Sequence, residues 1–242
     1  MKSIGLTLLF IASITVAANA QVGLEMGLNM ADLAIKSGGT SVATGFKPGF
    51  GMGTAADIGI GDGHLYFEPG LFFEMNGCKL TAGAGGNYSI NTITIPVYLE
   101  YKSGEKCGKR FFFGAGPVIG NNMSGSYTIN GSGGVPDQSG SFTIGSNAGD
   151  LKALDIGLGV NAGYQFRNGL YFRLHYQMGF ANILGGGDGN NSIKSSAFGL
   201  TMGYIFRRCR TISFHSMGSE RGDHWRGMSK GKYSRKPRYP IQ

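Results

Sequence analysis

Between residues 21 and 206 the sequence alternates apolar residues with polar or small residues, at a period of two, in eight separate stretches. Successive side chains of a β-strand point to opposite faces of the sheet, so this alternation predicts strands rather than helices. The predicted strands cover residues 22–30, 50–60, 65–75, 93–101, 111–119, 154–164, 170–180 and 197–206. The fold class that follows is all-β.

The connections between the predicted strands alternate in length. The long connections cover residues 36–45, 77–88, 121–150 and 184–194, and the short turns cover residues 61–63, 103–109 and 167–169. Outer-membrane barrels have short periplasmic turns and longer extracellular loops. Each strand also offers about 9–11 residues, the length that a tilted strand needs to cross the membrane. We therefore predict an eight-stranded antiparallel up-and-down transmembrane β-barrel, located in the cell outer membrane.

The scarcity of charge indicates which face of the barrel points outward. Only 23 of the 186 residues from 21 to 206 are charged, whereas soluble proteins carry about 25–35% charged residues on their surface. We expect the apolar face to contact outer-membrane lipid and the glycine-rich polar face to line a narrow interior. A secreted soluble binding barrel of the lipocalin type, with its apolar face inside, is the alternative.

The two ends of the chain differ from the region of predicted strands. Residues 1–20 combine Lys2, an apolar run and the small residues Ala18 and Ala20, which is the pattern of a secretory signal peptide. Residues 207–242 hold ten Lys or Arg and two acids, which accounts for the net charge of +8. We expect a basic, disordered extension there. Because a secreted chain rarely meets nucleic acid, we do not expect a nucleic-acid partner.

One set of polar side chains shares the predicted inward face. Its members are Glu25, Lys47, Asp57, Glu68, Glu74, Glu100, Asp155, Arg173 and His175. An eight-stranded barrel holds only side chains or one small ligand, and buried charges must be paired. We therefore interpret the set as a structural network of ion pairs, with Glu68, Glu74 and Glu100 as candidate partners of Arg173. The sequence indicates no catalytic, cofactor-binding or metal site and no cofactor.

The three cysteines, Cys78, Cys107 and Cys209, fit no zinc pattern and no dense disulfide framework. Cys78 follows the third predicted strand on the extracellular side. We expect a membrane-impermeant thiol reagent to label it on intact cells.

Several short motifs follow one another in a characteristic order. They are Phe67-Glu68-Pro69-Gly70-Leu71-Phe72-Phe73, Ile95-Pro96-Val97-Tyr98, Phe113-Gly114-Ala115-Gly116-Pro117 and the hairpin at 164–183. Together they resemble the PorT-like small outer-membrane β-barrel proteins, over residues 21–206. The resemblance implies a Gram-negative outer-membrane protein whose biochemical role is poorly defined.

The expected function is structural, interaction-based or weakly porin-like. The 121–150 segment is the candidate contact for a surface or envelope protein, because long surface loops often carry binding residues. His175 with Ser192 or Ser195 is the combination that would fit a lipid-modifying barrel enzyme. His175 lies on the inward face and needs a nucleophile beside it, so we expect no enzyme activity.

Overall fold

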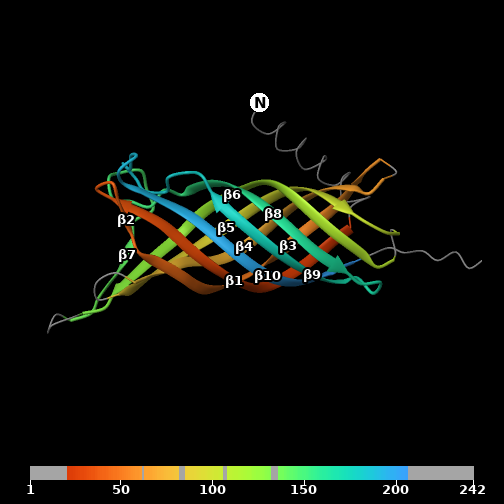
Figure 1. Ribbon diagram of the computed structural model, residues 1–242, viewed down its shortest axis with the longest axis horizontal. Coiled ribbons are helices and arrows are strands. Elements are labelled where there is room, and N and C mark those ends of the chain that lie inside the picture. Colours follow the sequence, from red (N-terminus) through yellow and green to blue (C-terminus); the bar gives the residue numbers. More distant parts are fainter. Residues whose placement is uncertain (1–20, 62, 82–84, 106–107, 132–135, 207–242) are drawn as a thin grey trace, which may run out of the picture. The chain divides into compact units, whose positions relative to one another are not determined.

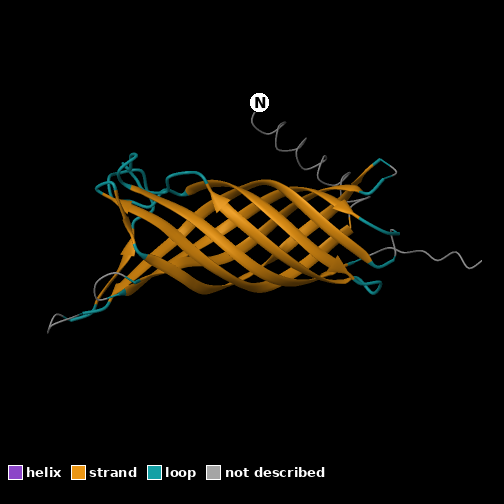
Figure 2. Ribbon diagram, in the orientation of Figure 1, coloured by secondary structure: helices purple, strands orange, loops and turns teal. Residues whose placement is uncertain are grey.

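A computed structural model describes residues 21–61, 63–81, 85–105, 108–131 and 136–206. The predicted signal peptide and the basic extension lie outside the described residues. The strands are β1 (Gln21–Ser37), β2 (Thr40–Val42), β3 (Thr44–Ile60), β4 (Leu65–Leu80), β5 (Gly86–Lys102), β6 (Arg110–Ile129), β7 (Gln138–Phe142), β8 (Leu154–Gln165), β9 (Leu170–Gly179) and β10 (Ser192–Ile205) (Figures 1 and 2). In the described part of the chain, no helix has the length and apolar character needed to cross a membrane.

Eight of these strands form a closed barrel. Each of β1, β3, β4, β5, β6, β8, β9 and β10 pairs antiparallel with the next in this order, and β10 pairs back onto β1. The closing ladder extends from the pair Gly23–Ile205 to the pair Lys36–Ser192. Closure gives every barrel strand two neighbours, which a membrane requires because hydrocarbon cannot satisfy free backbone groups. The predicted eight-stranded antiparallel barrel is confirmed.

The long-loop end contains more strand than the sequence predicted. β6 continues to Ile129, and residues Gln138–Phe142 of β7 pair with its last five residues. The prediction of a loop over 121–150 is therefore wrong for much of that segment. Its glycine, serine and asparagine content is typical of loops, but Tyr88, Tyr127 and Phe142 pack with ring centroids 5.3–6.4 Å apart and support the ladder. We call β7 and residues 122–129 of β6 the surface hairpin.

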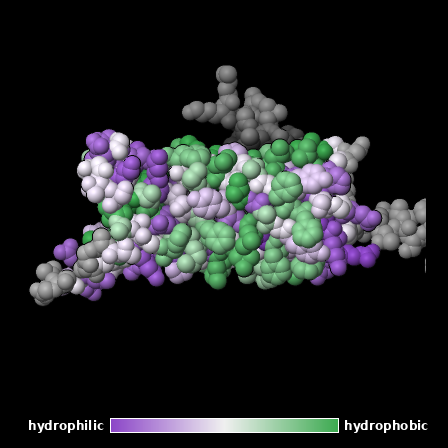
Figure 3. Space-filling model, viewed as in Figure 1, coloured by the Kyte–Doolittle hydropathy of each residue, from purple (hydrophilic) through white to green (hydrophobic). Residues whose placement is uncertain are grey.

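The outer surface of the barrel is apolar around its middle. Leu24, Met26 and Leu28 alternate outward on β1 with exposed fractions of 56%, 55% and 69%. Figure 3 shows hydrophobic side chains over the centre of the barrel and hydrophilic ones near both ends. This distribution confirms the assignment of the apolar face to the outside.

Inward-facing glycines make room for aromatic rings that fill the barrel. A Cβ on Gly203 would lie 2.3 Å from the Tyr171 ring, and one on Gly163 would lie 2.3 Å from the Phe112 ring. The glycine-rich face of the alternation is therefore the interior face, because larger residues there would displace these rings.

The interior is polar toward the short turns and apolar toward the long loops. At the long-loop end, one cluster contains Leu33, Cys78, Ile90, Leu151 and Ile183, all nearly inaccessible to solvent. We call it the mouth cluster. Leu151 and Ile183 reach it because their connections fold over the barrel end, with the Lys152 amide donating to the Ile183 carbonyl at 2.7 Å. Cys78 has an exposed fraction of 0%, so the expectation that it is accessible to a thiol reagent is wrong.

Candidate functional site

The short-turn half of the barrel holds a compact group of charged side chains, which we call the ion cluster. Its members come from five strands, since inward positions at one depth meet at the barrel axis. They are Glu25 on β1, Asp57 on β3, Glu68 on β4, Glu100 and Lys102 on β5, and Arg173 on β9. All six are at most 4% exposed, so water screens none of their charges appreciably.

Lys102 lies at the centre of three carboxylates. Its Nζ is 2.6 Å from Asp57 Oδ2, 3.0 Å from Glu100 Oε2 and 3.4 Å from Glu68 Oε2. The same nitrogen donates to Asp57 Oδ1 at 2.7 Å. One ammonium group therefore holds together three strands, β3, β4 and β5.

Arg173 joins the same group from the opposite side of the barrel. Its Nη2 lies 2.5 Å from Glu68 Oε1 and 3.3 Å from Glu100 Oε1, and its Nη1 lies 2.8 Å from Glu25 Oε1. Of the three partners predicted for Arg173, Glu68 and Glu100 agree with the structure. The prediction of Glu74 as a partner of Arg173 was wrong, because Glu74 lies nearer the long loops. Glu25 is the third carboxylate that contacts Arg173.

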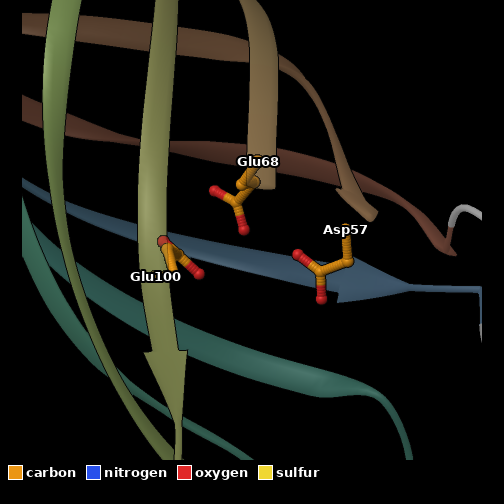
Figure 4. Close-up of side chains that lie close together, drawn as sticks. All are labelled: Asp57, Glu68 and Glu100. Carbon is orange, nitrogen blue, oxygen red and sulfur yellow. The ribbon is translucent and has the colours of Figure 1, made fainter. Parts of the chain in front are cut away.

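The three carboxylates around Lys102 face one another in Figure 4. Oxygen atoms of Asp57, Glu68 and Glu100 lie within 4.8 Å of one another, a spacing that a metal ion could also occupy. In this structure the Lys102 ammonium supplies the positive charge at that place. The residues present therefore form a set of ion pairs.

Aromatic rings pack against both cations. The Phe112 ring centroid lies 5.2 Å from Lys102 Nζ and 5.3 Å from the Arg173 guanidinium carbon, so one ring contacts both cations. The Tyr171 hydroxyl donates to Glu25 Oε1 at 2.6 Å. Cation–π contacts of this kind are strongest where the cation is buried, and Lys102 and Arg173 are only 2% and 3% exposed.

The remaining predicted interior residues lie outside the ion cluster. Glu74 accepts hydrogen bonds from Thr94 at 2.8 Å and Gln177 at 3.2 Å. Asp155 accepts one from the Ser195 hydroxyl. These contacts place Glu74 and Asp155 between the ion cluster and the mouth cluster.

Lys47 and His175 also stay apart from the ion cluster. Lys47 is half-buried near the long loops, where its ammonium donates to the Ser89 hydroxyl and, at 3.3 Å, to the Tyr88 carbonyl. His175 is buried against Gly199, and within the described residues its Nε2 has no hydrogen-bond partner.

Sequence reasoning missed Lys102 and Arg110, although both are buried in the interior. Lys102 follows Glu100 by two residues, so a strand continued one residue past the predicted 93–101 would have placed both side chains on the inward face. Arg110 precedes the predicted strand at 111–119; it donates to the Tyr66 hydroxyl at 3.1 Å. Bases beside a turn are usually solvated, so the position of these two residues in the sequence does not indicate that they are buried.

The interior leaves little free volume. One cavity of about 30 Å³ is bordered by Glu25, Glu74, Arg173 and His175. A second, of about 40 Å³, lies between Glu74, Asp155 and the mouth cluster. Each has room for about two water molecules. The arrangement can hold ordered water, but neither cavity is large enough for a nutrient-sized solute.

A closed, lipid-facing barrel with a side-chain-filled interior defines the class of outer-membrane β-barrel proteins. A family model described as "Outer membrane protein beta-barrel domain" matches residues 13–185. The chain belongs to this family, and the protein is located in the outer membrane.

The chain is also similar, at low identity, to several solved outer-membrane structures. Neisserial surface protein A is 15% identical, with 77% of this chain and 96% of that chain covered and a TM-score of 0.38. Ail, the attachment invasion locus protein of Yersinia pestis, is 12% identical, with coverages of 78% and 99% and a TM-score of 0.38. The N-terminal β-barrel domain of Pseudomonas aeruginosa OprF is 12% identical, with coverages of 76% and 99% and a TM-score of 0.31. No curated protein matches the sequence.

Proposed function

We propose that this protein is a closed, non-catalytic barrel that displays its surface hairpin to a partner protein at the cell surface or in the envelope. The observation that carries the proposal is that the interior is filled at two levels. The ion cluster crosses the barrel near the short turns, and the mouth cluster fills it near the long loops.

The pore alternative requires a continuous path of water through both levels. Lys102 and Arg173 link carboxylates from β1, β3, β4 and β5 across the axis, so opening a path would break several buried ion pairs at once. Leaving buried charges unpaired is costly. The mouth cluster would then have to open as well, exposing apolar side chains to water.

Planar bilayer recording tests closure directly. We expect the purified barrel to give no stable single-channel current, and the exposed-site variant Lys194→Ala to behave in the same way. Removing both cations of the ion cluster, in Lys102→Ser with Arg173→Ser, is expected to produce fluctuating current only if the protein still folds. Stable channels from the unmodified protein would contradict the proposal.

The surface hairpin is the candidate contact because it is folded and extends well past the membrane span. β6 has 20 residues, about twice the length that a tilted strand needs to cross the hydrocarbon. The ring contacts of Tyr88, Tyr127 and Phe142 brace this extension. A braced projection loses less conformational entropy on binding than a flexible loop would.

Site-specific photo-crosslinking on intact cells tests this role. We expect a cross-linker at Thr128, which is exposed on the hairpin, to give a discrete adduct with one protein. The same cross-linker at Asn190, an exposed position in a different long loop, should not give that adduct. Absence of a discrete adduct at Thr128 would remove the support for a protein partner there.

The absence of enzyme activity is part of the proposal. The Ser195 hydroxyl donates to Asp155, and among the described residues His175 forms no hydrogen bond with a serine. A serine nucleophile needs a base within hydrogen-bonding reach. We expect lipid profiles of cells carrying His175→Ala to match those of cells carrying the unmodified protein, and a changed lipid species would contradict this.

We also infer the narrower PorT-like assignment from the ordered motifs at 67–73, 95–98, 113–117 and 164–183. Three of these segments contribute inward side chains at the ion cluster or beside it, Glu68, Tyr98 and Arg173 among them. Swapping β8 and β9 with those of a PorT-like barrel tests the inference. We expect the chimera to fold, and a chimera that fails to close would argue against it.

A further inference from the structure

A hollow lies on the lipid-facing surface near the short-turn end of β8. Along β8 the outward side chains are Leu154, Ile156, Leu158, Val160, Ala162 and Tyr164. Ala162 is the smallest of them, and its register partners are Phe113 on β6 and Leu174 on β9. The small residue between larger neighbours leaves a depression of about 550 Å³, which Ala162 and Gly163 line together with larger side chains of β6 and β9 and with Leu200 of β10.

Aromatic side chains form the walls of this hollow. Phe111 and Phe113 are 67% and 60% exposed, and both line it together with Phe172. The Tyr164 ring packs against Phe111 with 4.7 Å between centroids, which fixes the end of the hollow nearest the short turns. A volume of this size lies within the range of small-molecule sites, and its lining is almost wholly apolar.

A second hollow lies just beyond the same pair of strands. Its volume is about 420 Å³, and it is lined by Glu105, Gly108, Lys109 and Arg167. Lys109 immediately precedes β6, and Arg167 follows β8 by two residues, while Arg110 and Gln165 are register partners. Both basic side chains are exposed, and neither forms an ion pair within the described residues. With Glu105 included, the lining carries a net charge of +1.

The distance between the two hollows matches the distance between the headgroup and an acyl chain of one lipid molecule. Lys109 lies four residues before Phe113, the register partner of Ala162, so the two hollows are about 13 Å apart along β6. With a strand tilt of about 45°, this corresponds to about 9 Å along the membrane normal, which is within the ~15 Å of one leaflet. The short turns face the periplasm, so the leaflet concerned is the inner one.

We propose that the β6–β8 seam binds one anionic glycerophospholipid of the periplasmic leaflet. An acyl chain lies in the hollow over Ala162 and Gly163, and the headgroup phosphate lies between Lys109 and Arg167. Charge complementarity selects a lipid with net negative charge over a zwitterionic one, since two cations outnumber the single Glu105. The apolar hollow contributes affinity for both lipids.

Native mass spectrometry of the whole chain in neutral detergent tests the proposal. The probes are synthetic phosphatidylglycerol and phosphatidylcholine with identical acyl chains, supplied in equal amounts. We expect the unmodified protein to retain one phosphatidylglycerol in preference to phosphatidylcholine. Lys109→Gln with Arg167→Gln should abolish that preference, at about fivefold for each cation removed. Lys79→Gln with Lys194→Gln removes two exposed cations near the long loops and should leave the preference unchanged.

A second pair of variants tests the acyl chain. Ala162→Phe fills the hollow and should reduce retention of both lipids, whereas Leu158→Phe, on the same outward face of β8, should not. The difference in gel mobility between unboiled and boiled samples reports whether each variant has folded. Equal retention of the two lipids by the unmodified protein, or unchanged selectivity in the Lys109 and Arg167 double variant, would show ordinary annular lipid and overturn the proposal.

Discussion

Two cationic residues neutralise the buried carboxylates of the barrel interior. Lys102 and Arg173 each contact three carboxylates, and Glu68 and Glu100 contact both cations. The group therefore behaves as one unit, and the effects of substitutions within it will not be additive. Its stability depends on complete pairing more than on any one short contact.

Removal of one cation should cost much more than removal of a matched pair of charges. We expect Arg173→Ala to lower the free energy of unfolding by about 3–5 kcal/mol, because Glu25, Glu68 and Glu100 lose a partner in a buried site. Likewise, Lys102→Met should be more destabilising than Lys102→Met combined with Asp57→Asn. Urea unfolding in detergent measures these differences, and Lys194→Ala is the exposed control. A loss below about 1 kcal/mol for Arg173→Ala would indicate solvated charges.

The position of Cys78 leads to a second prediction at this scale. Its side chain packs with Leu33, Ile90, Leu151 and Ile183 in the mouth cluster. In a variant with Cys107→Ser and Cys209→Ser, we expect an impermeant maleimide to leave the folded protein unmodified and to modify it fully in urea. Rapid labelling of folded protein on cells would mean that the mouth cluster opens readily.

At the scale of strands, the period-two pattern predicted more than the loop composition did. Each of the eight barrel strands overlaps the stretch where alternation predicted it, although β1, β3, β5 and β6 extend further toward the long loops. The overlap follows because each strand must present one face to lipid and the other to the interior. Beyond the membrane the alternation of apolar and polar residues no longer predicts strands. There β6 and β7 consist largely of glycine, serine and asparagine on both faces, and long-range pairing overrides their preference for loops.

The site was predictable only in part for a similar reason. Parity identified Glu25, Asp57, Glu68, Glu100 and Arg173 as inward-facing, but strand depth depends on tilt and stagger, which sequence does not specify. Glu74 was consequently assigned to Arg173 in place of Glu25. The central role of Lys102 was not predicted, because Lys102 is the last residue of β5 before a turn.

Close packing of glycine against aromatic rings yields a prediction for β10. A Cβ at Gly203 would lie 2.3 Å from the Tyr171 ring, so Gly203→Ala must displace that ring and its hydrogen bond to Glu25. We expect a destabilisation of about 1–3 kcal/mol, measured by urea unfolding. Gly189→Ala is the control, since its Cβ would have no neighbour within 4 Å. Equal stabilities of the two variants would contradict the packing described.

At the scale of the whole molecule, the pairing of β1 with β10 closes the barrel and leads to a further prediction. Leu28 and Leu200 are register partners on these strands. In a background without native cysteines, Leu28→Cys with Leu200→Cys should form a disulfide, because paired residues in adjacent strands have Cα atoms about 4.5–5.5 Å apart. Leu28→Cys with Leu158→Cys, on β8, should not. Mobility on a non-reducing gel after boiling distinguishes the two, and a disulfide in the second variant alone would contradict closure.

The pairing of the first strand with the last also determines when the protein can finish folding. Leu24 can pair with Tyr204 only after almost the whole barrel sequence has been translocated. Contacts so distant in sequence form slowly, because loop closure costs entropy. Until then the edges of β1 and of the growing sheet are free to pair with other chains. The time between synthesis and closure is therefore the interval in which this protein is most prone to aggregate. Assistance that holds the β1 edge until β10 arrives should raise its yield in the membrane more than any gain in the stability of the finished barrel.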